Sequence, residues 1–153
     1  MKKEKEDYEY LGPFTNGYRR VKKDGKWNLI DNKGNTISKE WFKSVSSMSN
    51  EGFALVLTDE GYNYINVSGR KVMDKPFKNA GTFENGFAPV MNDDYKWNYI
   101  NNSLRFLCKK WYPLVKMTWD KDTDTGMVYD GKGNEARINR IGMLVGDWKK
   151  SEE

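Results

Sequence analysis

The sequence has 153 residues, a length that fits one domain with a core of its own. Its 26 Lys and Arg against 22 Asp and Glu give a net charge of +4, a mild excess that does not by itself indicate nucleic acid. A single cysteine, Cys108, and the absence of histidine exclude an internal disulfide, a cysteine-based zinc cage and the Ser-His and Cys-His nucleophile pairs of many enzymes. We therefore expect no metal and no cofactor.

No segment resembles a secretory signal or a membrane-spanning helix. Residues 1–10 are charged and polar, without the apolar run that a signal peptide needs. No stretch approaches the roughly 20 apolar residues of a spanning helix. The sequence predicts a soluble protein in a reducing cytoplasm, with no membrane partner.

The first predicted unit follows a loose leader, residues 1–13. The leader ends in a Gly-Pro pair, which is expected to break the chain between the leader and the unit. Two strand-like runs, 18–23 and 26–31, flank Asp24-Gly25, and such a pair predicts a tight hairpin. A second turn at 32–35 leads to a short strand. One unit is thus a meander of strand, tight turn, strand, turn and short strand.

This plan recurs along the chain. Two kinds of position return at intervals of 34 or 35 residues, and we interpret both as structural: the aromatic residues Trp27, Tyr62 and Trp97, and the glycines Gly17, Gly52 and Gly86. A fixed period of this length is typical of a supersecondary unit that stacks on its own copies. The sequence predicts an all-β fold, a single domain over residues 1–153, with antiparallel repeats at about 14–47, 48–82 and 83–116.

A degenerate fourth copy is predicted to cap the stack over residues 117–148. Residues 127–130 align with 28–31, which puts Gly126 at the aromatic position. We expect 136–148 to add one final strand, since terminal repeats are usually atypical.

The second turn of the third copy lacks a glycine. Residues 102–104 stand where the first two copies have Gly34 and Gly69. We expect a different turn there, because glycine is the residue that most readily takes a positive φ.

The first repeat is cationic where the other two are mostly apolar. Charges on its first strand fit either a solvated cap at an edge strand, since edge charges deter strand addition, or a basic contact surface. The candidate partner-binding residues are Tyr18, Arg19, Arg20, Lys22, Lys23, Lys26 and Trp27.

Alternation along the second strand of each repeat puts aromatic residues on one face and an Asn-x-Ile pattern on the other. Because both faces carry apolar groups, we expect both to be covered. The aromatic residues form either the core or a ligand-binding stripe. The sheets could build a solenoid, a sandwich or a partly closed barrel.

The three copies resemble the WG-repeat family, also called KWG repeats. The matches are Gly52-Phe53-Ala54-x-Val56, Gly86-Phe87-Ala88-x-Val90, Gly25-Lys26-Trp27, Lys96-Trp97, Ile30-Asp31, Ile65-Asn66 and Ile100-Asn101. The resemblance covers roughly residues 14–116. It implies a β-rich repeat scaffold of bacteria and their phages, without an established catalytic activity and suggested to bind partners.

One departure from the family is consistent. The glycine that the family places after its tryptophan is replaced here by Asn28, Asn63 and Asn98. Asparagine tolerates positive φ better than most residues, so it either preserves an unusual backbone angle or forms a ladder of stacked side chains.

Two features are interpreted as structural. Cys108 follows an apolar run and is expected to pack as a small hydrophobe, although lysines follow it. Asp120, Asp122 and Asp124 resemble the opening of a calcium loop, but the sixth and twelfth positions hold neither the Gly nor the Glu that such a loop needs. We interpret this run as an acidic surface loop.

We expect a non-catalytic scaffold that binds another protein through exposed aromatic residues and strand edges, as a phage or bacterial accessory or inhibitor protein. The alternative is nucleic-acid binding, with the basic first repeat on phosphates and Tyr18 or Trp27 stacking on bases. Salt would separate the two, because phosphate contacts weaken steeply as its concentration rises.

Overall fold

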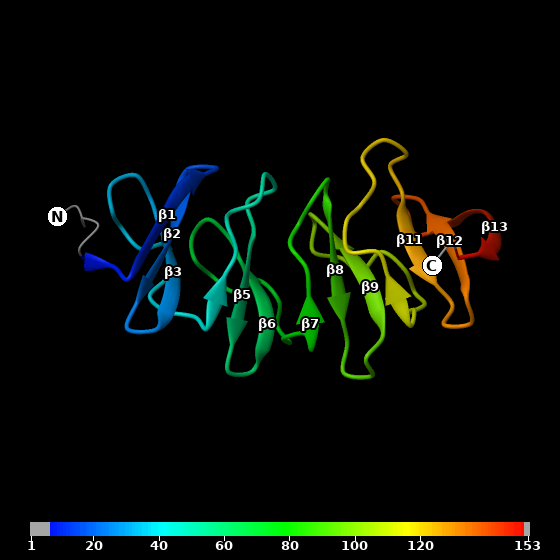
Figure 1. Ribbon diagram of the computed structural model, residues 1–153, viewed down its shortest axis with the longest axis horizontal. Coiled ribbons are helices and arrows are strands. Elements are labelled where there is room, and N and C mark those ends of the chain that lie inside the picture. Colours follow the sequence, from blue (N-terminus) through cyan, green and yellow to red (C-terminus); the bar gives the residue numbers. More distant parts are fainter. Residues whose placement is uncertain (1–6, 152–153) are drawn as a thin grey trace. The chain divides into compact units, whose positions relative to one another are not determined.

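A computed structural model describes residues 7–151, and the regular structure of these residues consists of short strands in four small antiparallel sheets (Figure 1). The predicted all-β fold is confirmed. The first six residues of the predicted leader lie outside the described part. The chain divides into two compact units, Met1–Pro76 and Phe77–Glu153, with two sheets each. Among the described residues, no helix has the length and apolar character needed to cross a membrane.

The first sheet contains three strands, β1 (Tyr10–Thr15), β2 (Tyr18–Lys23) and β3 (Lys26–Ile30). The predicted hairpin between β2 and β3 is confirmed, and Asp24 and Gly25 both have positive φ, as a tight primed turn requires. The predicted chain break is wrong, because the Gly-Pro pair lies inside β1 at a shift of register. An edge strand tolerates proline at such a bulge.

The second sheet contains β4 (Ser44–Val45), β5 (Ala54–Thr58) and β6 (Gly61–Ile65). It shares an apolar cluster with the first sheet: Leu29, Phe42, Val45, Met48, Ala54, Val56 and Ile65. On the opposite face of the first sheet, Tyr8 packs on Val21 and Ile30. Both faces of the first sheet are therefore covered, as the two-sided apolar pattern predicts.

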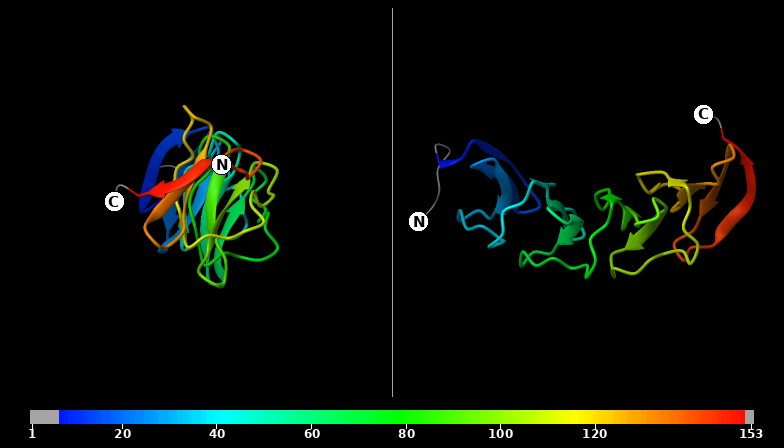
Figure 2. Two further views of the ribbon diagram at one scale, coloured as in Figure 1. Left: turned by 90° about the vertical axis from the view of Figure 1, so that its right-hand side faces the viewer. Right: turned by 90° about the horizontal axis from the view of Figure 1, so that it is seen from below.

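The second unit contains the third and fourth sheets, which are short and twisted like the first two (Figure 2). The third sheet has β7 (Asn79–Ala80), β8 (Phe87–Met91) and β9 (Trp97–Asn101). The fourth has β10 (Leu114–Val115), β11 (Gly126–Tyr129), β12 (Asn134–Ile138) and β13 (Leu144–Lys150), in that order. Two strands, β12 and β13, stand where the sequence predicts one.

The aromatic positions of the repeats belong mainly to the core. Tyr64 and Tyr99 are fully buried, and Trp97 is 6% exposed. Trp27 is half-buried and packs against the cluster of the first unit. The core interpretation is therefore confirmed for Tyr64, Trp97 and Tyr99, whereas Trp27 and Tyr62 are half-buried.

The opening glycines of the repeats provide backbone freedom. Gly17, Gly52 and Gly86 all have φ near +90°, at 89°, 88° and 92°. Most other residues are strained at this angle, which explains why glycine returns at these positions.

One turn recurs in all four copies. The side chains of Asp31, Asn66, Asn101 and Asn139 each accept hydrogen bonds from the backbone N–H groups two and four residues later, at 2.9–3.1 Å. Asn139 therefore marks the end of the strand equivalent to β3, which is β12. The predicted alignment of 127–130 with 28–31 is wrong by one strand.

The misalignment has a physical cause. Asp130 makes the same turn one strand earlier, since its carboxylate accepts from the N–H groups of Lys132 and Asn134. Meanwhile β12 has lost the Trp-Asn pair and carries Glu135 and Ala136 instead. The sequence pattern that follows β3 in the first copy therefore follows β11 in the fourth copy, although β12 is the strand equivalent to β3.

The expectation of a different turn after β9 is also wrong. Leu104 takes the place of glycine with φ of 63°, and its N–H still donates to the carbonyl of Asn101. The side-chain bonds of Asn101 hold this turn closed, so a non-glycine residue adopts the strained angle.

Both explanations for the repeated asparagines are wrong. Asn28, Asn63 and Asn98 are absent from the positive-φ residues of the described chain, and none bonds to another. Each buried amide instead donates to a carbonyl ten residues later in its own copy, that of Ser38, Met73 or Cys108. Each asparagine therefore ties the segment after the second turn back to its own sheet.

Candidate partner-binding site

The two arginines predicted to form a contact surface are held by the fold. Arg19 donates from Nε to the carbonyl of Gly12 at 2.7 Å, and its guanidinium lies 4.5 Å from the ring centre of Phe14. Arg20 donates to the carbonyl of Val45 at 2.8 Å and lies 4.5 Å from the ring centre of Trp27. The edge-strand interpretation is wrong, because β2 lies in the middle of its sheet. Both side chains link neighbouring backbone segments.

Three further predicted residues, Tyr18, Lys22 and Trp27, are half-buried in the same unit. Tyr18 and Trp27 pack against the apolar cluster shared by the first two sheets. The ammonium of Lys22 lies 5.6 Å from the ring centre of Trp27, and Tyr10 packs on the same indole at 5.4 Å. Two cations and a tyrosine ring therefore already lie against the indole of Trp27, which leaves less of it for base stacking.

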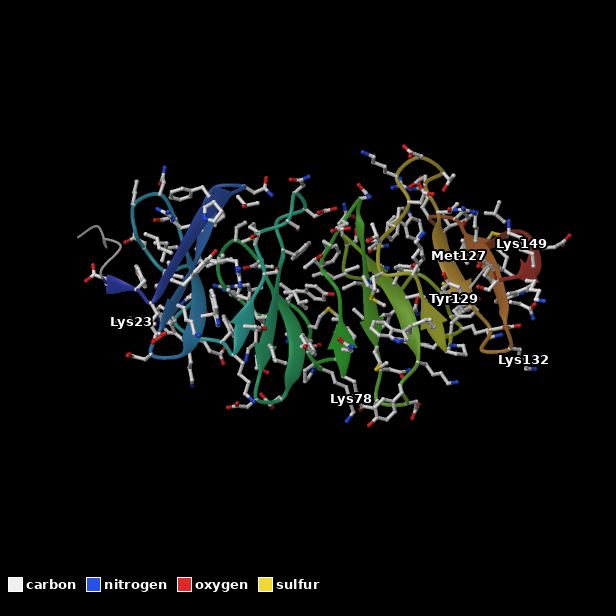
Figure 3. All side chains as sticks on the ribbon, in the orientation of Figure 1. Lys23, Lys78, Met127, Tyr129, Lys132 and Lys149 are labelled. Atoms are coloured by element: carbon white, nitrogen blue, oxygen red, sulfur yellow. The ribbon has the colours of Figure 1, made fainter. Side chains whose placement is uncertain are left out.

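Lys23 and Lys26 are the two predicted residues that reach open surface. They flank the Asp24-Gly25 turn, and both are exposed. Figure 3 labels Lys23 at the end of β2, next to the turn between β2 and β3. They line a pair of adjacent hollows of about 290 and 360 Å³ that share Lys26 and Trp41. We call the pair the Trp41 hollow; its lining is Lys23, Asp24, Lys26, Glu40, Trp41, Phe42, Lys43, Thr58 and Asp59.

Backbone pairing fixes Trp41 at the junction of the two sheets. Phe42, the next residue, exchanges both backbone hydrogen bonds with Trp27 at 2.7 and 2.8 Å, which adds this segment to the first sheet. Lys43 donates its N–H to the carbonyl of Leu57 in the second sheet at 2.9 Å. The chain therefore crosses between sheets at Trp41, whose half-buried indole also packs on the cluster of Tyr8, Val21 and Ile30.

The charges around the hollow are unequally paired. Lys43 forms an ion pair with Asp59 at 3.2 Å, and Glu40 forms one with Lys71 at 3.3 Å. Lys23 and Lys26 form no ion pair with any residue of 7–151. The hollow thus combines an anchored aromatic ring with two cations that remain available to a ligand.

Sequence reasoning identified the two lysines but missed Trp41. The signal was present, since Trp41-Phe42 returns as Pro76-Phe77 and Trp111-Tyr112 at intervals of 35 residues. Periodicity alone does not distinguish a packed aromatic residue from one at the rim of a hollow.

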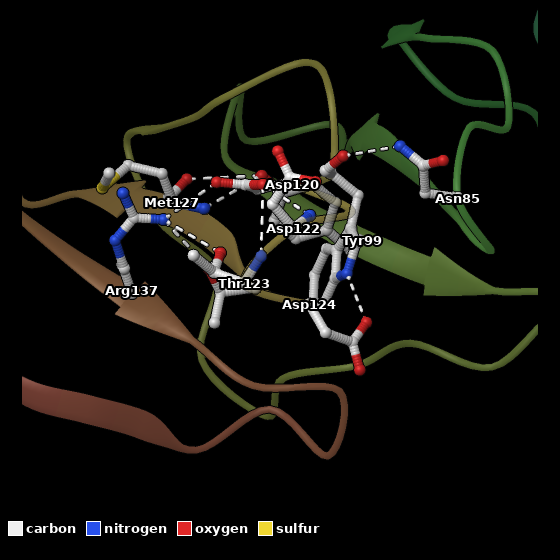
Figure 4. Close-up of polar contacts among 10 residues, drawn as sticks. Asn85, Tyr99, Asp120, Asp122, Thr123, Asp124, Met127 and Arg137 are labelled. Atoms are coloured by element: carbon white, nitrogen blue, oxygen red, sulfur yellow. Dashed lines mark hydrogen bonds and ion pairs between the residues drawn. The ribbon is translucent and has the colours of Figure 1, made fainter.

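The carboxylates of the acidic run after β10 bond to other groups of this protein (Figure 4). The carboxylate of Asp120 accepts from the N–H groups of Asp122 and Thr123 and lies 3.5 Å from Arg137. The N–H of Asp122 above all holds the pKa of Asp120 below its usual range. Asp124 accepts from the indole of Trp119 at 3.0 Å. These carboxylates stabilise a loop, and within the described chain no group of His, Cys, Asp or Glu is placed to hold a metal.

Cys108 packs in the core of the second unit, as predicted, and is 7% exposed. Burial raises the pKa of its thiol to about 11. The thiol is therefore protonated at neutral pH and poorly suited to act as a nucleophile.

This burial predicts slow thiol chemistry. A disulfide reagent should modify Cys108 in the native protein at pH 8 at least about 100-fold more slowly than in urea, since only the thiolate reacts. The native rate should rise as pH approaches the raised pKa. Equal rates in buffer and urea would show that the thiol is open.

The comparisons with known proteins agree with the repeat architecture. The family model described as "WG containing repeat" matches residues 7–27 and 64–97. No curated protein matches the chain. KlHsv2 with loop 6CD replaced by a Gly-Ser linker is a similar solved structure, with a TM-score of 0.59 and 14% identity over 92% of this chain and 52% of that chain.

Hsv2 of Kluyveromyces marxianus is also similar, with a TM-score of 0.52 and 12% identity over 92% of this chain and 49% of that one. The WD40 beta propeller domain of Doa1 has a TM-score of 0.42 and 10% identity over 93% of this chain and 53% of its own. This chain thus spans about half the length of these structures.

At such identities the likeness concerns the fold alone, a succession of small antiparallel sheets. The matched segments include four of the motifs that carry the resemblance: Gly25-Lys26-Trp27, Ile65-Asn66, Gly86-Phe87-Ala88-x-Val90 and Lys96-Trp97. The predicted resemblance is confirmed over residues 7–27 and 64–97, which match the WG-containing repeat.

Proposed function

We propose that this chain is a non-catalytic β-repeat scaffold that binds another protein through the Trp41 hollow. The observation that supports this most is the position of Trp41, a half-buried indole between two hollows with Lys23 and Lys26 beside it. Aromatic residues held in place at a surface are the usual energetic centres of protein interfaces. Bacterial or phage origin and a cytoplasmic location stay predictions.

The partner's chemistry follows from the lining. An apolar side chain of the partner would pack on the indole of Trp41, and an acidic side chain would pair with Lys23 or Lys26. The existing ion pairs at Lys43 and Glu40 form a polar rim around the centre. We therefore propose a partner segment that carries an apolar residue next to an acidic one.

Nucleic-acid binding has less support. Of its proposed contacts, Arg19 and Arg20 bond to backbone carbonyls, and Trp27 is covered by Arg20 and Lys22. Two exposed lysines are few phosphate contacts for a stable complex. The affinity for the true ligand should accordingly change little between low and moderate salt.

The test is a matched pair of tryptophan variants. Capture from the native cell and mass spectrometry would identify the partner, whose dissociation constant would then be measured with the purified chain. Trp41→Ala should weaken binding at least about tenfold, because an interface loses its aromatic anchor. Trp111→Ala should bind like the wild type, since it changes the same repeat position in the second unit, where the ring packs on Phe106.

Trp41 also packs on the apolar cluster of Tyr8, Val21 and Ile30, so its replacement could lower stability as well as affinity. A variant at an exposed residue of the hollow therefore tests binding separately. Lys26→Glu should weaken binding without lowering the melting temperature. The control variant Lys132→Glu, on an exposed turn of the fourth sheet (Figure 3), should change neither the binding affinity nor the melting temperature. The proposal is wrong if Trp41→Ala and Lys26→Glu both bind with wild-type affinity.

A further inference from the structure

The fourth sheet has one face in the core and one face that points away from the third sheet. Val115, Val128, Ala136 and Ile138 lie in the core cluster of the second unit. Alternation along the strands puts their neighbours on the opposite face. The register of the sheet arranges these neighbours in two rows across it: Leu114, Tyr129, Glu135 and Lys149, and Met127, Arg137 and Val145. We call these seven residues the Tyr129 face.

The Tyr129 face is equivalent to a face that is covered in the first unit. Its pairs Tyr129–Glu135 and Met127–Arg137 correspond to Lys22–Trp27 and Arg20–Leu29 of the first sheet. There the second sheet packs on this face, and Leu29 is fully buried. The repeat architecture therefore uses this side of a sheet for docking another sheet.

Two apolar residues of the Tyr129 face are exposed, while Met127 is 8% exposed. Leu114 is 47% exposed and Val145 is 48% exposed. Leu114 lies on β10 and Val145 on β13, so exposed apolar side chains stand at both outer strands of the face, where a partner surface could cover them.

We propose that two copies of this chain associate through their Tyr129 faces. The charges on the face favour a second copy. Glu135 and Arg137 have opposite charges and lie two residues apart on β12, with both side chains on the same face. In a two-fold arrangement with antiparallel β12 strands, Glu135 of each copy meets Arg137 of the other.

Both charged groups have capacity for this contact. Glu135 forms no ion pair with any residue of the described chain. Arg137 bonds to Asp120, Thr123 and Thr125 through one nitrogen, Nη1, so its remaining N–H groups are left for a carboxylate (Figure 4). Leu114 and Val145 of the two copies would close around this centre.

A head-to-tail contact with the first sheet is disfavoured. The outer face of that sheet, at Val21 and Ile30, is already covered by Tyr8, which is 8% exposed. A second copy would have to displace Tyr8 to bind there. The two-fold contact needs no such displacement.

Sedimentation equilibrium across a wide concentration range tests the proposal with the full chain. The wild type should form a dimer reversibly, and Val145→Glu should raise its dissociation constant at least about tenfold, because it buries charge among apolar groups. Val67→Glu is the matched control: Val67 is 52% exposed on a turn of the first unit, and this change should leave the dimer intact. A monomeric wild type, or a Val145→Glu dimer as tight as the wild type, would overturn the proposal.

A charge swap tests the two-fold pairing itself. Glu135→Arg and Arg137→Glu should each weaken self-association, since like charges then meet across the axis. An equal mixture of the two variants should form a heterodimer, in which every contact again joins opposite charges. Should Arg137→Glu not fold, the contrast between Glu135→Arg and the wild type still decides, and an undiminished Glu135→Arg dimer would contradict this pairing.

Discussion

Replacing Asn98 by alanine should lower the free energy of unfolding by about 3 kcal/mol, because it leaves several buried backbone groups without partners. Asn98 is fully buried. Its amide donates to the carbonyl of Cys108 at 2.7 Å and accepts from the N–H groups of Cys108 and Tyr99 at 3.1 and 2.7 Å. Each of these groups would lose a hydrogen bond in a place that water does not reach.

The measurement is urea unfolding, with the midpoint compared at unchanged slope. Asn102→Ala is the matched control, since Asn102 is exposed on the following turn and should change stability by less than about 0.5 kcal/mol. If both variants unfold at the wild-type midpoint, the asparagine does not hold the segment around Cys108 to its sheet.

Replacing Gly69 by alanine should destabilise the first unit by about 3 kcal/mol, for two separate reasons. Gly69 has φ of +77°, where a β-carbon is strained. A β-carbon there would also overlap the carbonyl oxygen of Ile37, so the turn of the second sheet could not keep its place against the first. The docking of the second sheet on the first thus requires a residue without a β-carbon at position 69.

Gly17→Ala separates the two contributions. Gly17 has φ of +89°, but a β-carbon there meets nothing within 4 Å. This variant should lose only the backbone term, about 1 kcal/mol. Thermal unfolding of both variants, followed by tryptophan fluorescence, would show the difference; equal losses would mean that the contact with Ile37 does not hold the sheets together.

Sequence could predict the features that depend on residues close together in the chain. The hairpin at Asp24-Gly25 and the recurrence of Trp27, Tyr62 and Trp97 follow from local turn chemistry and strand alternation. The fourth copy was misaligned because β12 has exchanged the Trp-Asn pair for Glu135 and Ala136. A repeat that loses its signature residues keeps its strand pairing.

The candidate site could be predicted only in part, because it depends on contacts distant in the sequence. The sequence predicts Arg20 as a surface cation, yet its side chain donates a hydrogen bond to the carbonyl of Val45, 25 residues away in the second sheet. Trp41 gains its position from pairing of its neighbours with Trp27 on one side and Leu57 on the other. Neither arrangement has a local sequence signal, since it arises where two sheets meet.

Hydrogen exchange of the chain with and without its captured partner, at one fixed chain concentration, tests the binding proposal most directly. The proposal predicts slower exchange in the complex at residues 23–26 and 40–43, which line the Trp41 hollow, and no change at the equivalent turn of the fourth sheet, 130–134. Unchanged exchange at both lining segments, with protection only elsewhere, would contradict it.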